Sequence, residues 1–402
     1  MTTRVHIFFV VRQTLPAVGP RSIQLAHWMR YLSSANKLHV ISQSELYGPG
    51  KSPVIRRSGA VKKVRRLGGN ILRYLAPVSF RDSQIKPRLL DGFFKSFEAA
   101  GRPRDAVLVT VSKYDVNHQA GLEIKKRTGL PWAAFFSDPW TLSSYYPLTR
   151  LDVPYQAAAE RQVLENADLL LFPNEELRDS FLGLYPKPPE KTAIVPPAFD
   201  PAHYPRQSAR APRPGEILIR HVGNFYARRQ PFFLFKTFQQ FKTAFPEKAK
   251  AFRFDLVGSL EPVSEDPDWG EWRNHFHLSP RVSYEEALRL MKEADVLLSI
   301  DAATPENTYR PSKLIEYVGA RRPIWVITPP NSPAERFAQK IPGCVASLAD
   351  DRESILAGLH KLHDLYAQTV PTGWTPPAEI YNSFHAQPIA RHLESLLQTV
   401  VQ

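Results

Sequence analysis

The feature that most restricts the fold of this chain is an alternation of apolar strands and amphipathic helices, which runs through the first half and starts again in the second. Apolar runs of the first half are residues 5–11, 38–41, 106–111 and 167–172. Those of the second half are residues 217–222, 254–258, 294–300 and 324–327. Short apolar runs separated by helical periodicity are typical of parallel strands covered on both faces. The alternation therefore predicts an α/β protein, and its restart predicts two doubly wound domains.

The length of the chain agrees with two domains. Its 402 residues exceed what one ordinary core accommodates and fit two domains of about 200 residues. We expect the first domain to span residues 1–200 and the second to span residues 201–380. Residues 200–216 are rich in Pro, Arg, Ala and Ser and have no periodicity, so we interpret them as the linker. Residues 381–400 carry an amphipathic pattern that predicts one last helix.

One helix of the second half begins with an unusual set of charges. Pro311 or Ser312 can open it, because proline is pre-set for the first helical position and a serine hydroxyl can accept an amide hydrogen bond there. Arg310 and Lys313 flank this start, where the helix dipole disfavours a cation by roughly 0.3 to 1 kcal/mol unless an anion is also present. Free amides and two cations together predict a phosphate site. Glu316, about one turn further on, offers two acceptor oxygens for a vicinal diol such as ribose; the alternative is a solvated surface helix.

The positive charge of the chain is concentrated in its first half. Of the net charge of +13, residues 1–200 contribute +11 (28 Lys plus Arg against 17 Asp plus Glu), and residues 201–402 contribute +2 (24 against 22). Such a bias indicates an anionic partner: membrane lipid, an acidic glycan or nucleic acid. Residues 56–75 are the most basic, and their helical pattern of apolar and basic positions favours an anionic membrane surface. A solvated excursion with a few core contacts is the alternative.

Cysteine content and hydropathy restrict the compartment. The single cysteine excludes a disulfide framework and a cysteine-based zinc site, and it favours a reducing cytoplasm. No run of about 18 uncharged apolar residues occurs, and the N-terminus lacks the order of a signal peptide. We therefore expect a cytoplasmic protein, peripheral at the inner face of the membrane. Asp266 and Asp268 form an acidic loop without a preceding apolar strand, so we interpret them as a surface turn and predict no metal and no cofactor.

Residues 311–317, Pro-Ser-Lys-Leu-Ile-Glu-Tyr, and the strand that follows them resemble the donor-site segment of the family 4 retaining glycosyltransferases. The resemblance implies the GT-B fold, in which two Rossmann-like domains face each other across a cleft and the last helix packs back on the first domain. It also implies that Glu316 binds the nucleotide ribose and that the backbone near Ser312 and Leu314 meets the diphosphate. The position eight residues before Glu316, a glutamate in many members, is Thr308 here.

The resemblance assigns further donor-binding residues outside this segment. After the first strand of the second domain the family has a glycine and then a basic residue that braces the leaving diphosphate. Gly223 matches the glycine, and Arg228, or alternatively Arg229, matches the basic residue. In the first domain Gly19 matches the glycine of the first loop, which faces the donor phosphates; a simple turn explains a lone glycine equally well.

On the acceptor side, the resemblance implies four residues at the carboxyl ends of first-domain strands, where open α/β sheets bind ligands. These are Ser112, Lys113, His118 and Asp138. Taken alone, His118 is equally explained as a residue at a helix start, and Asp138 before Pro139 as a turn former.

Taken together, the resemblance implies a hexosyltransferase-like enzyme that moves a sugar from a nucleotide-diphosphate sugar to a glycan or lipid-linked acceptor, without a metal, in cell-surface polysaccharide or glycoconjugate synthesis. A catalytically inactive GT-B-like binding subunit is the first alternative. A basic nucleic-acid-binding protein is the second, but no recognised nucleic-acid-binding module supports it, so we expect no nucleic-acid partner.

Overall fold

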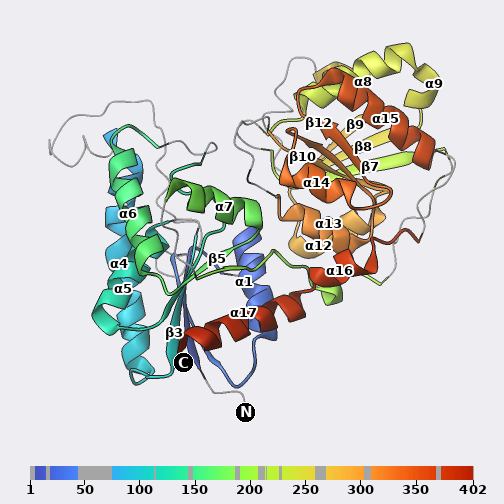
Figure 1. Cartoon of the computed structure of the whole chain (residues 1–402). Helices are drawn as coiled ribbons and strands as arrows, with labels where there is room; N and C mark the ends of the chain where they lie inside the picture. The colour runs from blue at the N-terminus through green and yellow to red at the C-terminus, as the bar shows by residue number, and fades with distance from the viewer. Residues whose placement is uncertain are drawn as a thin grey trace. The chain divides into compact units, whose positions relative to one another are not determined.

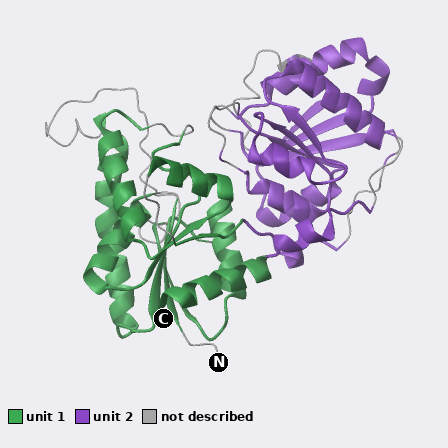
Figure 2. Cartoon of the chain, in the orientation of Figure 1, with its two compact units in different colours: residues 1–196, 386–402 green, residues 197–385 purple. Residues whose placement is uncertain are grey.

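The computed structural model describes residues 5–14, 19–43, 75–112, 115–143, 148–185, 191–206, 213, 215–225, 229–258, 269–302, 308, 310–367 and 373–401. The chain forms two compact units, which Figure 2 shows in different colours. Unit 1 consists of residues 1–196 and 386–402, and unit 2 of residues 197–385. The sequence-based boundaries, 200/201 and 380/381, lie four and five residues from these divisions.

Unit 1 is built on a six-stranded parallel sheet with the order β2-β1-β3-β4-β5-β6. Its strands are β1 (His6–Val11), β2 (Lys37–Ser42), β3 (Ala106–Val111), β4 (Trp132–Phe135), β5 (Leu169–Phe172) and β6 (Thr192–Ile194). Its helices are α1 (Pro20–Tyr31), α4 (Pro77–Ala99), α5 (Val116–Thr128), α6 (Asp152–Asn166), α7 (Glu175–Leu184) and α17 (Ala386–Val401). Figure 1 shows α4, α5 and α6 on one side of the sheet and α1 and α17 on the other.

Unit 2 is built on a second six-stranded parallel sheet with the order β12-β11-β10-β7-β8-β9. Its strands are β7 (Ile217–Val222), β8 (Phe252–Val257), β9 (Phe276–Ser279), β10 (Val296–Ile300), β11 (Ile324–Thr328) and β12 (Val345–Leu348). Its helices are η1 (Pro201–His203), α8 (Phe232–Ala244), α9 (Pro246–Ala249), α11 (Trp269–Trp272), α12 (Tyr284–Glu293), α13 (Lys313–Ala320), α14 (Pro333–Gln339), α15 (Arg352–Tyr366) and α16 (Ala378–Ser383).

Each face of the unit 2 sheet carries its own apolar core. Side chains of α8 and α15 pack against one face, together with Ile219, Leu298 and Ile327. Side chains of α12, α13 and α14 pack against the other. Apolar residues on both faces of one strand are what a central parallel strand requires. The two Rossmann-like parallel sheets predicted from the alternation are confirmed, and the reversal of strand order between β7 and β10 marks the place where such sheets bind ligands.

The predicted linker at residues 200–216 is partly wrong. Phe199, Asp200 and Tyr204 are buried, and η1 lies between the last two. The Tyr204 hydroxyl donates to the Glu316 carbonyl at 2.8 Å, so this segment packs against α13. Gly319 permits this packing, because a Cβ there would lie 2.6 Å from the Tyr204 hydroxyl oxygen and 2.7 Å from the Phe199 ring. Local composition missed these contacts because they are made with a helix more than 100 residues away.

The single last helix predicted over residues 381–400 is instead two helices, α16 and α17, which are interrupted at Phe384 and His385. The Phe384 carbonyl accepts a hydrogen bond from the Phe199 amide at 3.0 Å, and His385 forms a parallel bridge with Phe199. These contacts hold the interruption in unit 2, whereas α17 packs on α1 and β3 in unit 1. Within the described residues, no helix has the length and hydropathy needed to cross a bilayer.

Candidate functional site

Charged side chains gather at the carboxyl ends of β7 and β10, where the strand order of unit 2 reverses. His221 is the penultimate residue of β7, Asp301 directly follows β10, and Lys313 opens α13. Arg229, which precedes α8, forms an ion pair with Asp301, and Glu316 lies one turn into α13. The topology of the sheet thus brings five polar residues from four parts of the chain to the expected ligand site.

Lys313 is held by a histidine within the first strand of the unit. Its Nζ lies 3.2 Å from His221 Nε2, and His221 Nδ1 lies 3.1 Å from the Leu298 carbonyl oxygen. A carbonyl only accepts hydrogen bonds, so Nδ1 carries the proton and Nε2 accepts from the lysine. Burial, and then the charges of Lys313 and Arg229, hold the pKa of His221 well below its usual range. His221 is therefore neutral.

The environment of Lys313 weakens its positive charge. Burial lowers its pKa to about 7; the charge of Arg229 acts in the same direction, while Asp301 and Glu316 oppose both. Gly223 leaves room for the lysine, because a Cβ at this residue would lie 2.8 Å from Nζ. The φ angle of Gly223 is also +142°, a conformation that other residues rarely adopt. The turn after β7 thus requires glycine for two independent reasons.

Arg229 and Asp301 form a buried ion pair with an Arg229 Nη2 to Asp301 Oδ1 distance of 2.7 Å. Their exposed fractions are 8% and 6%. The Thr328 hydroxyl adds a longer contact to the same carboxylate at 3.4 Å. Burial raises the pKa of Asp301, and the cations Arg229 and Lys313 oppose that rise. The charges of Arg229 and Lys313 therefore both act on this one buried carboxylate.

Glu316 retains part of its surface and has a perturbed pKa. Burial raises that pKa to about 7, against the opposing effects of Tyr284 and Lys313. The Tyr284 hydroxyl is enclosed beside Glu316, but among the described residues no hydrogen bond of good geometry satisfies it. The next residue, Tyr317, fixes the helix: its hydroxyl accepts from the Val222 amide and donates to the Leu298 carbonyl, each at 3.1 Å. The start of α13 is thus rigidly attached to β7 and β10.

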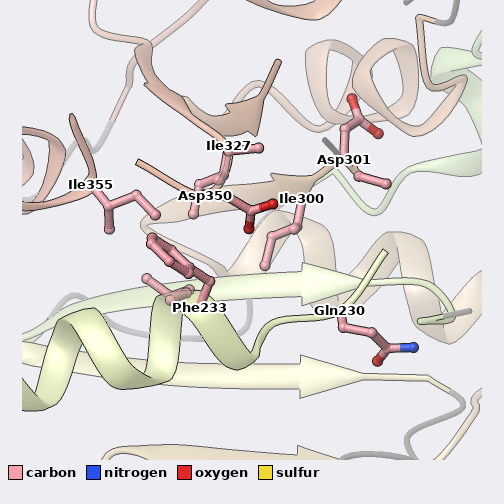
Figure 3. Close-up of a pocket in the computed structure, with 10 residues that line it drawn as sticks. Gln230, Phe233, Ile300, Asp301, Ile327, Asp350 and Ile355 are labelled. Atoms are coloured by element: carbon pink, nitrogen blue, oxygen red, sulfur yellow. The ribbon is translucent and has the colours of Figure 1, made fainter. Parts of the chain in front are cut away.

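A small pocket lies next to the same strand ends, on the face of the sheet that α8 and α15 cover (Figure 3). Its wall is mainly apolar, and its polar members are Gln230, Asp301 and Asp350. Asp301 is therefore shared between this pocket and the charged cluster.

Two predicted donor-site residues have other surroundings. Arg310 stacks on the rings of Phe337 and Phe384, with its guanidinium carbon 5.4 Å and 5.3 Å from their centroids. The Leu314 side chain is fully buried in the core, and its amide is already bonded to the Pro311 carbonyl at 3.0 Å. Both residues thus make contacts within their own unit, and their predicted contact with a donor stays a prediction.

Ser312 lies at a helix start, as the sequence predicts, whereas Gly19, which the sequence predicts in a loop, directly precedes α1. Ser312 occupies the N-cap of α13, yet its hydroxyl makes no cap hydrogen bond. The predicted serine cap is therefore wrong. Gly19 is the N-cap of α1, where its amide donates to the Ser22 hydroxyl at 2.9 Å.

Asp138 lies in a polar cluster at the carboxyl ends of β3 and β4. It accepts from the Ser137 hydroxyl at 2.6 Å and lies 3.7 Å from the Arg21 guanidinium. Ser112 joins the cluster, because its hydroxyl accepts from the Ser137 amide at 2.9 Å. Arg21 could not be predicted from the sequence, since one arginine in the first turn of a helix is a weak signal.

His118 lies in the interior of unit 1. Its exposed fraction is 0%, and its Nδ1 lies 2.7 Å from the Thr110 hydroxyl. The ring packs against Phe136 and Trp140, and burial lowers its pKa to about 3. The ring of His118 is thus neutral and enclosed, and the acceptor-side role implied for this residue stays a prediction. Its position in the first turn of α5 fits the alternative of a helix-start residue.

Several predicted residues lie outside the described part of the chain: Lys113, Arg228, Asp266, Asp268 and all but the last residue of the basic segment 56–75. Thr308 is described. Among the described residues, no group of three or more His, Cys, Asp or Glu side chains is arranged to hold a metal ion.

No protein-family model matches this sequence, and neither does any curated protein. Solved structures match almost the whole chain. Sucrose-phosphate synthase from Thermosynechococcus elongatus is 14% identical and has a TM-score of 0.68, with 98% of this chain and 99% of that one covered. A glycosyltransferase from Rickettsia africae is 11% identical with a TM-score of 0.65, and an E. coli trehalose-6-phosphate structure bound with UDP-2-fluoro glucose is 12% identical with a TM-score of 0.63; both cover 99% of each chain. At such identities the likeness shows the fold, and the fold of this chain is GT-B.

Proposed function

We propose that this chain is a family 4 retaining glycosyltransferase that moves a sugar from a nucleotide-diphosphate sugar to a glycan or lipid-linked acceptor in cell-surface polysaccharide or glycoconjugate synthesis. The observation that carries the proposal is the convergence of Lys313, Arg229 and Glu316 at the strand ends of unit 2. A structurally similar protein holds UDP-2-fluoro glucose, a nucleotide sugar. We assign no cofactor.

In this proposal the cations bind the diphosphate and Glu316 binds the ribose. Lys313 and Arg229 face the leaving group, Arg228 adds a third cation, and the backbone at Gly223 and Ser312 allows close approach of the phosphates. Ionised Glu316 accepts hydrogen bonds from two vicinal hydroxyls. Because Thr308 stands where many family members have a glutamate, contacts to the donor sugar come from other residues.

The proposed reaction breaks the bond between the anomeric carbon and the diphosphate oxygen. The electron pair of that bond leaves with the nucleoside diphosphate, the acceptor oxygen bonds to the anomeric carbon, and the acceptor proton ends on the departing phosphate. Fixed cations stabilise the negative charge that develops, which is usually a large part of catalysis. Attack from the face that the leaving group vacates retains the configuration. The cations of the chain supply the charge compensation, so we propose metal-independent transfer.

We assign the acceptor side to unit 1, with Asp138 as its candidate catalytic residue and Gly19 at the first loop. Asp138 is half-buried and lies at the carboxyl ends of β3 and β4. An ionised carboxylate there can accept a hydrogen bond from an acceptor hydroxyl. Arg21 and Ser137 hold it in place.

A panel of nucleotide sugars in a thermal-shift assay tests the donor site. We expect the nucleotide sugars with one particular base to raise the melting temperature. Lys313→Ala should weaken the binding of these nucleotide sugars by about tenfold or more, because a hydrogen bond to a charged group contributes roughly 1.5 to 3 kcal/mol. Lys340→Ala, at an exposed lysine after α14, is the matched control. Equal binding by both variants would refute the donor site; binding without transfer or donor hydrolysis would favour the inactive binding subunit.

We further propose that an anionic membrane surface is a partner of unit 1 and that the protein is cytoplasmic and peripheral. The basic segment 56–75 supports this, and so does a cluster of exposed apolar side chains near its end. These are Leu75, Leu151, Val153 and Tyr155. The Thr149 hydroxyl donates to the Leu75 carbonyl at 2.7 Å, which brings the starts of α4 and α6 together. We propose no nucleic-acid partner.

A further inference from the structure

His221 occupies a position in β7 that the apolar pattern of the strand would give to a core residue. Its exposed fraction is 0%, and its ring stacks on Phe225 with a centroid distance of 4.3 Å and an interplanar angle of 17°. Both ring nitrogens are nevertheless used: Nδ1 donates to the Leu298 carbonyl, and Nε2 accepts from Lys313. A residue that only fills the core does not need the contact of Nε2, which is made with the Lys313 ammonium.

A lysine side chain needs such a contact to stay in one position. It has four rotatable bonds, and ordering it has a conformational cost of up to about 2 kcal/mol. Arg229 repels the Lys313 ammonium, whereas Asp301 and Glu316 attract it from two sides. The neutral acceptor, Nε2 of His221, and the space that Gly223 leaves open together hold the Lys313 ammonium in one position.

We infer that His221 is the positioning residue of Lys313: it orders the ammonium for a diphosphate without itself touching the ligand. The inference rests on the proposed donor site and names a residue that determines its affinity. The imidazole acts only as an acceptor toward Lys313, because an ammonium donates hydrogen bonds and cannot accept them.

The same contact favours the charged form of the lysine. Free Lys313 loses its proton near pH 7, so binding of a diphosphate above that pH requires proton uptake, and affinity falls as pH rises. Removal of the acceptor nitrogen should shift this fall to lower pH. A variant that merely loosens the fold would weaken binding by the same factor at every pH.

Calorimetric titration of the full chain with inorganic pyrophosphate, UDP, GDP and ADP from pH 6 to 9 tests the inference. His221→Gln can place an amide oxygen near the position of Nε2, whereas His221→Asn keeps a donor toward Leu298 but does not reach Lys313. We expect His221→Asn to weaken binding by about tenfold at pH 7 and to shift the alkaline fall downward. His221→Gln should stay within about threefold of wild type, although it loses the bond to Leu298. His275→Gln, at a histidine that directly precedes the edge strand β9, is the control.

The outcomes separate the inference from the proposed function. If wild type binds none of the four probes, both are overturned. If Lys313→Ala loses binding while His221→Asn binds like wild type, only the positioning role is overturned. The role is also overturned if the Asn and Gln variants weaken binding equally at every pH, because that result indicates a structural effect. Nitrogen NMR shifts of His221 provide a reading without ligand: Nδ1 should stay protonated and Nε2 unprotonated from pH 6 to 9.

Discussion

Two side chains of opposite charge lie in the first turn of α13, and both have a pKa of about 7 in place of their usual values. Lys313 supports anion binding when it is protonated, and Glu316 accepts hydrogen bonds best when it is ionised. Because the two requirements oppose each other, we predict a bell-shaped pH dependence of nucleotide binding with a maximum near pH 7. Titrations across this range measure it. Glu316→Gln should remove the fall on the acid side, and Lys313→Ala the fall on the alkaline side.

Stability provides a check on the Glu316 assignment. Its folded pKa lies above the unfolded value, so its contribution to stability is complete below about pH 4.5 and is lost as pH rises through about 7. At pH 8 the carboxylate is an unfavourable charge. Glu316→Gln should therefore have a higher melting temperature than wild type at pH 8 while it binds nucleotide less well. An unchanged melting temperature would contradict the burial of this carboxylate.

The requirement for glycine at residue 223 can be tested by substitution. Gly223→Ala adds a Cβ that would lie 2.8 Å from Lys313 Nζ and forces alanine to a φ of +142°. We expect destabilisation by about 1 to 3 kcal/mol and loss of nucleotide binding, measured by denaturant unfolding and titration. Gly215→Ala is the control: φ is also positive, at +79°, but the space around its Cβ is open. This variant should lose stability and keep its ligand affinity.

At this scale the sequence predicts residues whose position is set by local rules. Lys313 and Glu316 follow from the charge pattern at the start of a helix, whereas Gly223 follows from the resemblance to the family. His221 and Asp301 could not be found in the same way. In the sequence, His221 lies within an apolar strand and Asp301 directly follows one, and only the order of the strands brings them close to Lys313. The contact of Arg310 with Phe337 and Phe384 could not be predicted either, because these rings are distant from it in sequence.

At the scale of secondary structure, the starts of α4 and α6 carry exposed apolar side chains, one of which, Leu75, is also the last residue of the basic segment 56–75. We predict that the chain sediments with vesicles that contain phosphatidylglycerol but not with phosphatidylcholine alone, and that salt weakens the association. The double variant Leu151→Ser with Val153→Ser should weaken it further. Leu184→Ser with Leu365→Ser, at exposed leucines elsewhere, is the matched control. Equal sedimentation of both double variants would assign binding to charge alone, and binding of RNA without binding of vesicles would contradict the membrane proposal.

Periodicity predicts most helices and strands because each of them buries a regular stripe or face. It does not predict the interruption between α16 and α17, since the pattern of apolar residues continues through it and the cause is the pairing of Phe384 and His385 with Phe199. The burial of Phe199, Asp200 and Tyr204 escaped prediction for a similar reason. A proline-rich segment has the composition of a linker whether or not its aromatic side chains are buried.

At the scale of the whole molecule, the last helix belongs to unit 1 although the chain reaches it from unit 2. Leu393 in α17 has an exposed fraction of 0%. Leu393→Asp should destabilise unit 1 by roughly 3 kcal/mol or more, because it buries an unpaired charge. Calorimetry should show a lowered transition for unit 1 and an unchanged nucleotide-induced shift for unit 2. Ser395→Asp, on the exposed side of the same helix, should leave both transitions in place; a loss of the nucleotide-induced shift in Leu393→Asp would indicate that the two units do not unfold separately.

The bond between the Phe199 amide and the Phe384 carbonyl joins the two ends of unit 2. Unit 2 is therefore an insertion whose entry and exit strands meet. If residue 385 were joined to residue 197 through a short turn and the chain were opened at another position, the result would be a circularly permuted version of this unit. Joining residue 196 directly to residue 386 would make unit 1 one continuous chain, and we predict that the two units of the proposed enzyme can then be produced and assayed as separate proteins.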